Sequence, residues 1–561
     1  MPVDPSHRLP VSALIARTLA AHVTDCFGLM GNGNAYLLDA LLDPEIVGGP
    51  VSFTAVRHEA GAVVAADAYY RASGRMAVAT ATYGAGFTNT ITALAEAVQA
   101  RTPLLLVVGD APTTGARPWD VDQPVMAAAA GATTFTVGRD DAASTTVQAI
   151  RHAVTHRTAV VLAIPYDLAA AEAGEAPDRD GASELVAPAV PLAPDATELD
   201  AVAGLLAEAR HPLLLAGRGA WLADAGAELG RLAEAVGAVT ACSALGRGIF
   251  PDGRYDLGVA GGFGQEDAMA LVHEADLAVV FGASLNQFTT RFGALFAART
   301  RVVQVDLAAH PTNPAVTDFV AGDARLAAAG LADRLAARGA ASSRWRETID
   351  FAPLRVRDAG DGIAADGRLD PRSVAARIGE LLPADRVVVS DGGHFIGWAN
   401  TYWPVTCPDR MVMVGTAFQS IGLGFASVPG AAAARPESTI VLTTGDGGGL
   451  MAIADLESAV RTAGGRGLAV VWNDTAYGAE VNLYGLKGLA EQPMRIPEVD
   501  FAAVARGFGA EGVVVRSLDD LDALRDWADR PATERPFLLL DCRVSPHVIA
   551  PYQREIIAIN S

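Results

Sequence analysis

The chain has 561 residues, 51% of them hydrophobic, and a formal net charge of −21 at pH 7. At roughly 150 residues per domain, this length predicts three or four domains. The acidic balance argues against a nucleic-acid or anionic-membrane partner, because both kinds of partner bind basic surfaces. The four cysteines form no CxxC pair, so neither a zinc site nor a disulfide framework is indicated. The start has no signal pattern and no apolar run is long enough to span a bilayer, so the expected location is the cytoplasm.

The first segment, residues 1–178, alternates helical and strand patterns. Residues 11–22 repeat their apolar side chains with a helical period, and strand-forming runs follow at residues 77–81, 104–109 and 159–164. Strands that alternate with helices predict a parallel sheet in an α/β domain.

Glu59 lies at the start of a helix made mostly of small residues, RHEAGAVVAADAYYRASGR from Arg57 onward. Most glutamates at a helix start do no more than stabilise the helix through its dipole. The face formed by residues 60–66, however, is suited to close packing against another surface. We therefore expect Glu59 to lose part of its contact with solvent beside that surface.

The stretch of residues 186–194, rich in Pro, Ala and Val and without a clear period, is typical of a linker. The second segment, residues 190–340, contains strand patterns at residues 212–216, 277–282 and 302–306. It predicts a second doubly wound α/β domain. The glycines that follow its first strand are weak evidence for a nucleotide site, because plain doubly wound domains also carry them.

The third segment, residues 366–546, follows a second linker rich in Gly, Asp and Ala. A strand pattern at residues 387–389 leads into the sequence DGGH, which ends at His394. A histidine at a strand end is either a solvated or capping residue, or a contact to a substrate or a diphosphate.

Two acidic residues follow neighbouring strands of this third segment. The chain reads TIVLTT-GDGG, then a single helix with apolar spacing over residues 450–460, then a strand LAVVW that leads into NDTAYG. Asp446 and Asp474 therefore lie at the carboxyl ends of two strands joined by a helix. That edge of an α/β sheet is where ligands bind.

The sequence GDGG around Asp446 suits a diphosphate together with a metal ion. Glycines after a strand let the main chain approach a phosphate, whereas an aspartate between them repels a phosphate unless a cation intervenes. Mg²⁺ resolves this conflict, since it binds carboxylate, amide and carbonyl oxygens and leaves places for diphosphate oxygens. A single GDG is more often an ordinary crossover turn. The second polar cluster, Asn473 and Asp474, favours the metal site.

The spacing between GDGG and NDTAYG resembles the diphosphate and metal motif of thiamine-diphosphate (ThDP) enzymes of the acetolactate synthase and 2-oxo acid decarboxylase type. The resemblance implies that Asp446, Asp474 and the carbonyl of Ala476 bind Mg²⁺. Asp474 replaces the usual asparagine and its added charge faces the diphosphate, so Asn473 is the alternative ligand. The further cofactor-binding residues that the resemblance implies are Gly445, Gly447, Gly448, Asn473 and Tyr477.

Two other stretches resemble the same family. The helix after Arg57 resembles the helix that carries the activating glutamate, which implies that Glu59 hydrogen-bonds N1′ of the aminopyrimidine and is the main catalytic residue. The sequence SIGLG resembles the place of a large apolar residue that wedges ThDP into a V. This implies that Ile421 lies between the cofactor rings and that the carbonyl of Gln419 accepts from the 4′-amino group. Ordinary core packing is the alternative for Ile421.

The resemblance covers nearly the whole chain as three consecutive doubly wound α/β domains: pyrimidine-binding, middle and diphosphate-binding. In this family the active site lies between the first domain of one subunit and the third domain of another, which implies a homodimer or homotetramer with shared sites. Relatives that bind FAD use arginines beyond a strand end of the middle domain. Residues 282–288 contain no arginine, so FAD is not expected.

Four residues, Asn32, Gln123, His394 and Glu480, are the candidates that steer substrate and protons. Asn32 matches the position of a proton-transferring aspartate in simple 2-oxo acid decarboxylases, and residues 110–123 lack the histidine pair of those enzymes. Without these groups the acyl anion equivalent left after CO₂ loss would persist long enough to attack a second carbonyl. Glu480, by contrast, matches a catalytic glutamate of the decarboxylases. Its other interpretation is a solvated helix glutamate.

We therefore predict a ThDP- and Mg²⁺-dependent, acetolactate synthase-like carboligase. It would decarboxylate a 2-oxo acid such as pyruvate and join the acyl group to a second carbonyl compound. A lysine and a tryptophan of true acetolactate synthases are missing, so the chain is a relative of them. The alternatives are a non-oxidative decarboxylase that releases an aldehyde and a non-catalytic cofactor-binding homologue.

Overall fold

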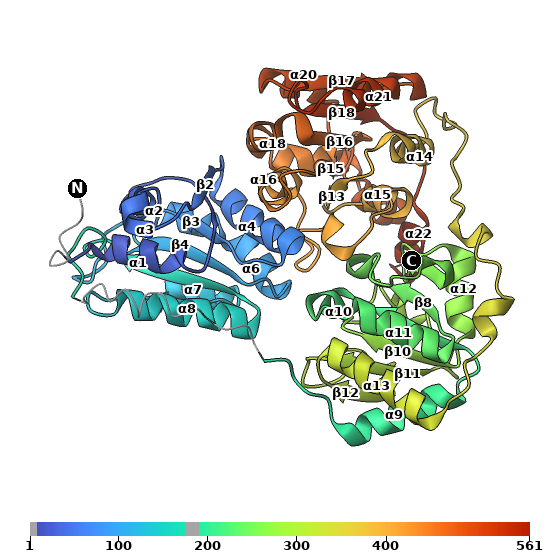
Figure 1. The fold of residues 1–561 in the computed structure, drawn as a ribbon. Helices are drawn as coiled ribbons and strands as arrows, with labels where there is room; N and C mark the ends of the chain where they lie inside the picture. Colours follow the sequence, from blue (N-terminus) through green and yellow to red (C-terminus); the bar gives the residue numbers. More distant parts are fainter. Residues whose placement is uncertain (1–7, 175–185, 187–189, 561) are drawn as a thin grey trace.

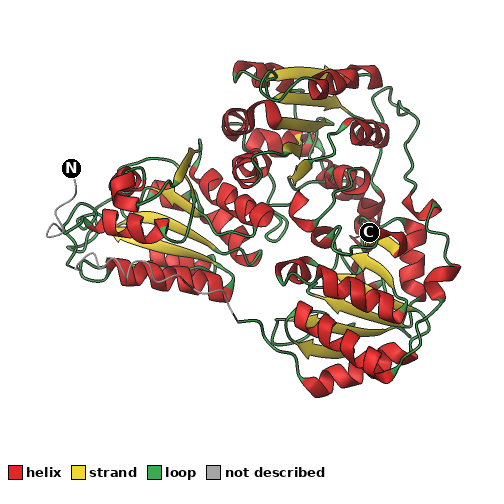
Figure 2. Ribbon diagram, viewed as in Figure 1, coloured by secondary structure: helices red, strands yellow, loops and turns green. Residues whose placement is uncertain are grey.

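The chain forms three six-stranded sheets, in which every pair of neighbouring strands is parallel and the central strands are mostly buried runs of Val, Leu, Ile and Ala (Figures 1 and 2). The computed structural model describes residues 8–174, 186 and 190–560. Helices flank each sheet, so the predicted fold class of three consecutive α/β domains is confirmed. Within the described part of the chain, no helix has both the length and the apolar character needed to cross a bilayer.

The first domain has the strand order β2-β1-β3-β4-β6-β5. Its strands are β1 (Asp25–Gly28), β2 (Ser52–Ala55), β3 (Val78–Ala81), β4 (Leu104–Asp110), β5 (Thr133–Thr136) and β6 (Ala159–Pro165). Its main helices are α1 (Val11–Ala20), α4 (Glu59–Ser73), α5 (Ala85–Thr88), α6 (Ile91–Gln99), α7 (Gln123–Ala129) and α8 (Ala142–His156). β6 is buried along its whole length, which explains its continuous apolar sequence, whereas the equally buried β3 includes the polar Thr80. The expected boundary at residue 178 lies outside the described residues.

The middle domain has the strand order β12-β11-β10-β7-β8-β9. Its strands are β7 (Pro212–Ala216), β8 (Val239–Cys242), β9 (Asp256–Val259), β10 (Leu277–Phe281), β11 (Arg301–Asp306) and β12 (Asp318–Ala321). The flanking helices include α9 (Ala196–Glu208), α10 (Arg218–Leu222), α11 (Gly226–Val236), α12 (Glu266–Glu274) and α13 (Ala324–Arg338). Of the predicted linker, residues 186 and 190–194 are neither helix nor strand, and residues 187–189 are not described.

The third domain has the strand order β14-β13-β15-β16-β18-β17. Its strands are β13 (Arg386–Ser390), β14 (Met411–Val412), β15 (Thr439–Gly445), β16 (Gly467–Asn473), β17 (Glu511–Val515) and β18 (Leu538–Arg543). Its helices include α14 (Pro371–Leu381), α15 (Ile396–Tyr402), α16 (Gly424–Ala434), α19 (Gly478–Leu483), α20 (Phe501–Gly507) and α21 (Asp522–Asp529). A last helix, α22 (Pro551–Asn560), follows the third sheet, and its Tyr552 packs on Phe263 and Phe288 of the middle domain.

The single helix predicted after Asp446 is wrong, because the chain forms two helices there. α17 (Asp446–Met451) ends at Ala452, whose φ of −118° and ψ of 29° leave the helical region, and α18 (Asp455–Ala463) begins three residues later. The three consecutive glycines of α17 weaken its helix propensity. The break allows α17 to start at the sheet edge while α18 packs against α16.

The small-residue face of α4 packs against α16 of the third domain, which confirms the close packing expected for this helix (Figure 1). A Cβ atom added to Gly430 on α16 would lie 1.9 Å from the carbonyl oxygen of Ala65 on α4. Only glycine therefore fits at this crossing. The two domains share one hydrophobic core, which includes Val63 and Val64 from α4 and Phe425 and Val428 from α16.

Candidate active site

Three aspartates gather at the carboxyl ends of neighbouring strands in the third sheet. β15 pairs with β13 on one side and with β16 on the other, so Asp391, Asp446 and Asp474 follow adjacent strands. All three are buried. Buried carboxylates need hydrogen-bond donors, an opposite charge or a metal ion, so each aspartate must have a partner.

Asp446 accepts hydrogen bonds from main-chain groups that follow β15 and β16. Gly447 N donates to Oδ1 at 2.9 Å, and Thr475 N donates to Oδ2 at 2.8 Å. Burial, followed by the charge of Asp474, raises the pKa of Asp446 to about 7. A cation placed between the two carboxylates would stabilise the ionised form and so offset both causes of this shift.

Asp474 is paired with His394, which follows β13. His394 Nε2 lies 2.8 Å from Asp474 Oδ2, and Ala476 N donates to Asp474 Oδ1 at 3.2 Å. Burial by itself lowers the pKa of His394, but the charges of Asp474, Asp446 and Glu480 outweigh burial and raise it. Gly478 gives the imidazole its space, since a Cβ atom there would lie 2.5 Å from His394 Cε1.

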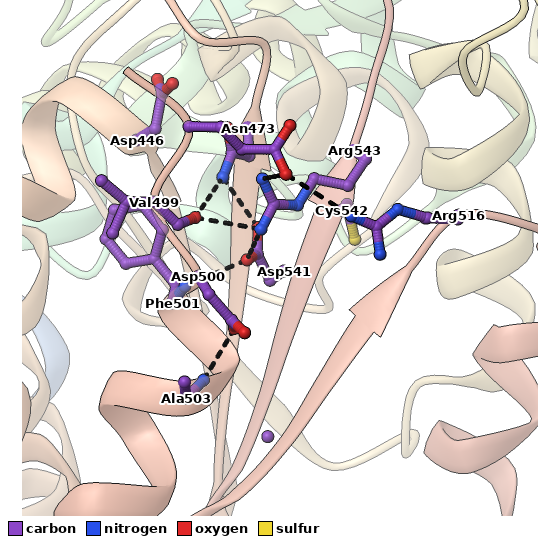
Figure 3. Close-up of polar contacts among 12 residues, drawn as sticks. Asp446, Asn473, Val499, Asp500, Phe501, Ala503, Arg516, Asp541, Cys542 and Arg543 are labelled. Carbon is purple, nitrogen blue, oxygen red and sulfur yellow. Dashed lines mark hydrogen bonds and ion pairs between the residues drawn. The ribbon is translucent and has the colours of Figure 1, made fainter. Parts of the chain in front are cut away.

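The side-chain amide of Asn473 has a fixed orientation (Figure 3). Its Nδ2 donates to Asp541 Oδ1 at 2.9 Å and to the carbonyl oxygen of Val499 at 3.1 Å. Asp541 is held in turn by Arg543 Nη2 at 2.7 Å and by Phe501 N at 3.0 Å (Figure 3). Asn473 Oδ1 is buried and accepts no hydrogen bond within the described structure.

The oxygen atoms at this edge suit a hard divalent cation. Asp474 Oδ2 and Asn473 Oδ1 are both buried without a hydrogen-bond donor of good geometry, and the carbonyl of Ala476 follows in the same loop. Among the described residues, no three His, Cys, Asp or Glu side chains are grouped so as to hold a metal ion by themselves. A Mg²⁺ ion here would therefore need main-chain and diphosphate oxygens as its further ligands.

The glycines of the GDGG sequence are required by close neighbours. A Cβ atom at Gly447 would lie 2.6 Å from Tyr477 Cε1, and one at Gly448 would lie 2.8 Å from Asp391 Oδ2. Gly445 ends β15 beside the ring of Phe395. A Cβ atom added to Gly445 would lie 2.9 Å from Phe395 Cδ1. The main chain of α17 is thus packed tightly between Tyr477 and Asp391.

Asp391 also anchors the loop that contains Gln419 and Ile421. Its Oδ1 accepts from Gly422 N at 3.0 Å and from Leu423 N at 3.2 Å, while Oδ2 accepts from Thr444 Oγ1 at 2.8 Å. Burial raises the pKa of Asp391. We did not predict this role from the sequence, although a strand followed by Asp-Gly-Gly repeats the pattern seen at Asp446.

Glu59 occupies the N-terminus of α4, as predicted, but remains partly exposed in the single chain. Its Oε2 accepts from Asn89 Nδ2 at 3.0 Å. The neighbouring Arg57 reaches the third domain, where it pairs with Glu457 of α18 at 2.7 Å. Within the described chain, no hydrogen bond or ion pair joins Glu59 to the aspartates at the third sheet edge.

The other predicted residues have different surroundings. Asn32 is exposed and its Nδ2 donates to Tyr83 Oη at 2.9 Å, whereas Glu480 is exposed on α19 within electrostatic range of His394. Gln123 is buried and binds only main chain, since Oε1 accepts from Gly84 N at 2.7 Å and Nε2 donates to the carbonyl of Gly109 at 2.9 Å. These contacts give Gln123 a supporting role in the first domain.

Three family descriptions match the chain in order. Residues 10–130 match "Thiamine pyrophosphate enzyme, N-terminal TPP binding domain", residues 199–331 match its central domain, and residues 391–540 match its C-terminal TPP binding domain. Each match falls on one of the three sheets, and together they cover more than half of the chain.

Individual relatives cover almost the full length. The chain is 28% identical to the sulfoacetaldehyde acetyltransferase of Castellaniella defragrans, over 98% of this chain and 95% of that protein. It is 27% identical to acetolactate synthase 2, chloroplastic, of Zea mays, over 95% and 84%. The solved thiamine diphosphate-dependent 4-hydroxybenzoylformate decarboxylase of Rhodococcus jostii RHA1 superposes with a TM-score of 0.77 at 20% identity, over 96% and 99%. This last similarity supports the fold alone.

Proposed function

Because the chain belongs to the thiamine pyrophosphate enzyme family, we propose that this ThDP-dependent enzyme is a Mg²⁺-requiring carboligase of the acetolactate synthase type. Its donor would be a 2-oxo acid such as pyruvate, and its acceptor a second carbonyl compound. The full-length similarity to an acetyltransferase and to an acetolactate synthase supports this direction.

Asp446, Asp474 and the carbonyl of Ala476 are the proposed ligands of Mg²⁺. The buried Oδ2 of Asp474 has only the imidazole of His394 beside it, at 2.8 Å, which supports this choice, and the unpartnered Oδ1 of Asn473 keeps that residue as the alternative ligand. When bound, ThDP supplies the carbon nucleophile and the electron sink that decarboxylation of a 2-oxo acid requires. Tyr477 and the tightly packed glycines around Asp446 would shape the diphosphate site.

The observation that carries the choice of ligation is the environment of Asn32. Its side chain is an amide, whose Nδ2 donates to the hydroxyl of Tyr83. The position of the decarboxylase aspartate therefore presents no carboxylic acid. Gln123 is an amide whose polar atoms bind main-chain groups, so we propose no proton transfer from it either. An acyl anion equivalent that is not protonated from this side is available to a second carbonyl.

A non-oxidative decarboxylase is the second candidate, because one observation favours it. His394 and Glu480 lie on the same edge as Asp446, and the surrounding carboxylates raise the pKa of His394. A protonated imidazole beside the metal motif is a proton donor, which a decarboxylase needs to release an aldehyde.

We also propose that a second copy of the chain completes the site. Glu59 is bonded to Asn89 and lies apart from the hydrogen-bond network of the third sheet edge. Phe418, next to Gln419, and Met451, the last residue of α17, are exposed in the single chain. An apolar surface beside a binding edge suits a subunit interface. FAD is not part of the proposed function, since residues 282–288 carry no arginine.

Product analysis by carbon-13 NMR tests the proposed reaction. Labelled pyruvate is incubated with the protein, ThDP and Mg²⁺, with and without an added aldehyde. A new carbon–carbon bond, as in acetolactate or an acyloin, supports carboligation. Acetaldehyde as the sole product would contradict carboligation and support the decarboxylase. Unchanged pyruvate in the presence of bound ThDP would exclude pyruvate as the donor.

A further inference from the structure

Glu96 of α6 belongs to a buried charged cluster outside the sheet edge that we propose binds the cofactor. Glu96 is 0% exposed, and its partners on α4, Asp67 and Arg71, are 1% and 4% exposed. Arg71 Nη2 donates to Glu96 Oε1 at 2.9 Å, and Arg71 Nε donates to Asp67 Oδ1 at 2.8 Å. Thr102 Oγ1 also donates to Asp67 Oδ1, at 2.7 Å. Three buried charges are tolerated because they are paired and hydrogen-bonded.

The cluster reaches across the domain boundary to the main chain of the loop 413–421. Phe418 N donates to Glu96 Oε2 at 2.6 Å, and Ala417 N donates to Glu96 Oε1 at 3.3 Å. Arg71 Nη1 donates to the carbonyl of Met413 at the start of the same loop. The side chain of Phe418 is 45% exposed, so an exposed loop is held from beneath by a fully buried carboxylate.

The far end of this loop is held by the second buried carboxylate, Asp391, which accepts from Gly422 N and Leu423 N. Between the two anchors lies Gln419, a non-glycine residue with a φ of 60°. Such a backbone conformation persists only where its surroundings maintain it. Two carboxylates from different domains therefore fix the segment that contains Gln419 and Ile421.

We propose that Glu96, supported by Arg71, is a positioning residue that fixes Gln419 and Ile421 for contact with the cofactor. The proposal rests on the proposed function only in that these two residues meet ThDP; the hold on the loop does not depend on it. Since α4 also carries Glu59 at its N-terminus, one helix contributes both the activating glutamate and part of this clamp.

Amide hydrogen exchange of the cofactor-free protein tests the clamp directly. In the wild-type protein the amides of Ala417 and Phe418 should be protected, because both donate to a buried acceptor. In the Glu96→Gln variant one acceptor oxygen becomes an NH₂ group, so these amides should exchange at least about tenfold faster. Asp323→Asn is the matched control, since Asp323 in the middle domain is buried and accepts from Arg325 N and Leu326 N. It should leave the loop 413–421 unchanged.

A second variant guards against loss of the fold. Glu96→Asp keeps the charge beside Arg71 but shortens the side chain, so it should also release the loop. In either folded variant, the C2 proton of bound ThDP should exchange about tenfold more slowly while the Kd for ThDP changes less than about threefold, because the diphosphate ligands are untouched.

Unprotected amides at Ala417 and Phe418 in the wild-type protein would overturn the clamp. Equal exchange rates for the loop 413–421 in the Glu96→Gln and Asp323→Asn variants would overturn it as well. A protected loop in a protein that does not bind ThDP would instead overturn the proposed function and leave the clamp standing.

Discussion

His394 Nε2 lies 2.8 Å from Asp474 Oδ2, across the carboxyl ends of β13 and β16. Asp474 occupies the place of the asparagine in the motif that this chain resembles, so it adds a negative charge beside the proposed diphosphate site. The imidazole opposite is held toward its positive form by that carboxylate, with smaller effects from Asp446 and Glu480. The pair therefore offsets the charge that the aspartate introduces.

Asp474→Asn is expected to lower the pKa of His394, because Asp474 is the largest influence that raises it. NMR titration of the ring nitrogens measures this shift. Asparagine is also an oxygen ligand, so the Kd for ThDP with Mg²⁺ should change less than about threefold. Glu480→Gln is the control and should produce a smaller decrease. An unchanged His394 pKa in the Asp474 variant would contradict the pairing.

Protons should compete with Mg²⁺ for Asp446 near neutral pH. Burial and then the charge of Asp474 raise its pKa to about 7. The ion binds the ionised form, so affinity is highest above that pKa and falls by up to about tenfold per pH unit below it. Calorimetry on either side of pH 7 measures the change, with free ThDP and Mg²⁺ as the correction for the diphosphate. Equal corrected affinities at the two pH values would exclude this competition.

Glu59→Gln should abolish most activity while leaving ThDP bound, because the amide cannot exchange a proton with the aminopyrimidine. An unchanged rate would remove Glu59 from the catalytic role. If subunits share sites, a mixture of Glu59→Gln and Asp446→Ala chains should regain up to about a quarter of the activity. Random exchange makes about half of the dimers mixed, and one of the two sites in each mixed dimer carries neither change. A mixture as inactive as its two components would argue for sites formed within one chain.

Gly430→Ala tests the packing of α4 on α16. The added Cβ would lie 1.9 Å from the carbonyl oxygen of Ala65, so the helices must separate, at a cost of about 1–3 kcal/mol in the free energy of unfolding. Gly507→Ala is the control, because nothing lies within 4 Å of its added Cβ. It should be neutral or stabilising by up to about 1 kcal/mol. Equal denaturant midpoints for the Gly430→Ala and Gly507→Ala variants would contradict the tight packing of α4 on α16.

Apolar runs in the sequence predicted several of the fully buried strands, among them β15 and β16 with the residues that follow them, but not β8 and β18. The apolar runs before Asp446 and Asn473 end within one residue of the predicted positions, because a parallel strand covered by helices needs a continuous apolar sequence. Periodicity did not predict the break at Ala452, since the same apolar spacing suits one helix or two short ones.

The sequence did not predict the hydrogen bonds between residues that are far apart in the chain. Glu96 and Phe418 are separated by 322 positions, and nothing near Glu96 in the chain indicates that its partner is a main-chain amide of another domain. The same applies to Asp541, which orients Asn473 from 68 positions away. For Gln123 the sequence indicated a candidate for steering substrate or protons, and it gave no sign that the polar atoms bind main-chain groups.

Calorimetric titration of the purified protein with ThDP, with Mg²⁺ present and after its removal by a chelator, tests most directly whether the Asp446 edge is the cofactor site. We predict saturable binding of ThDP that requires the metal, is lost in Asp446→Ala and is retained in the control Gly507→Ala. Binding of equal strength without a divalent metal, or undiminished binding by Asp446→Ala, would contradict the proposed site.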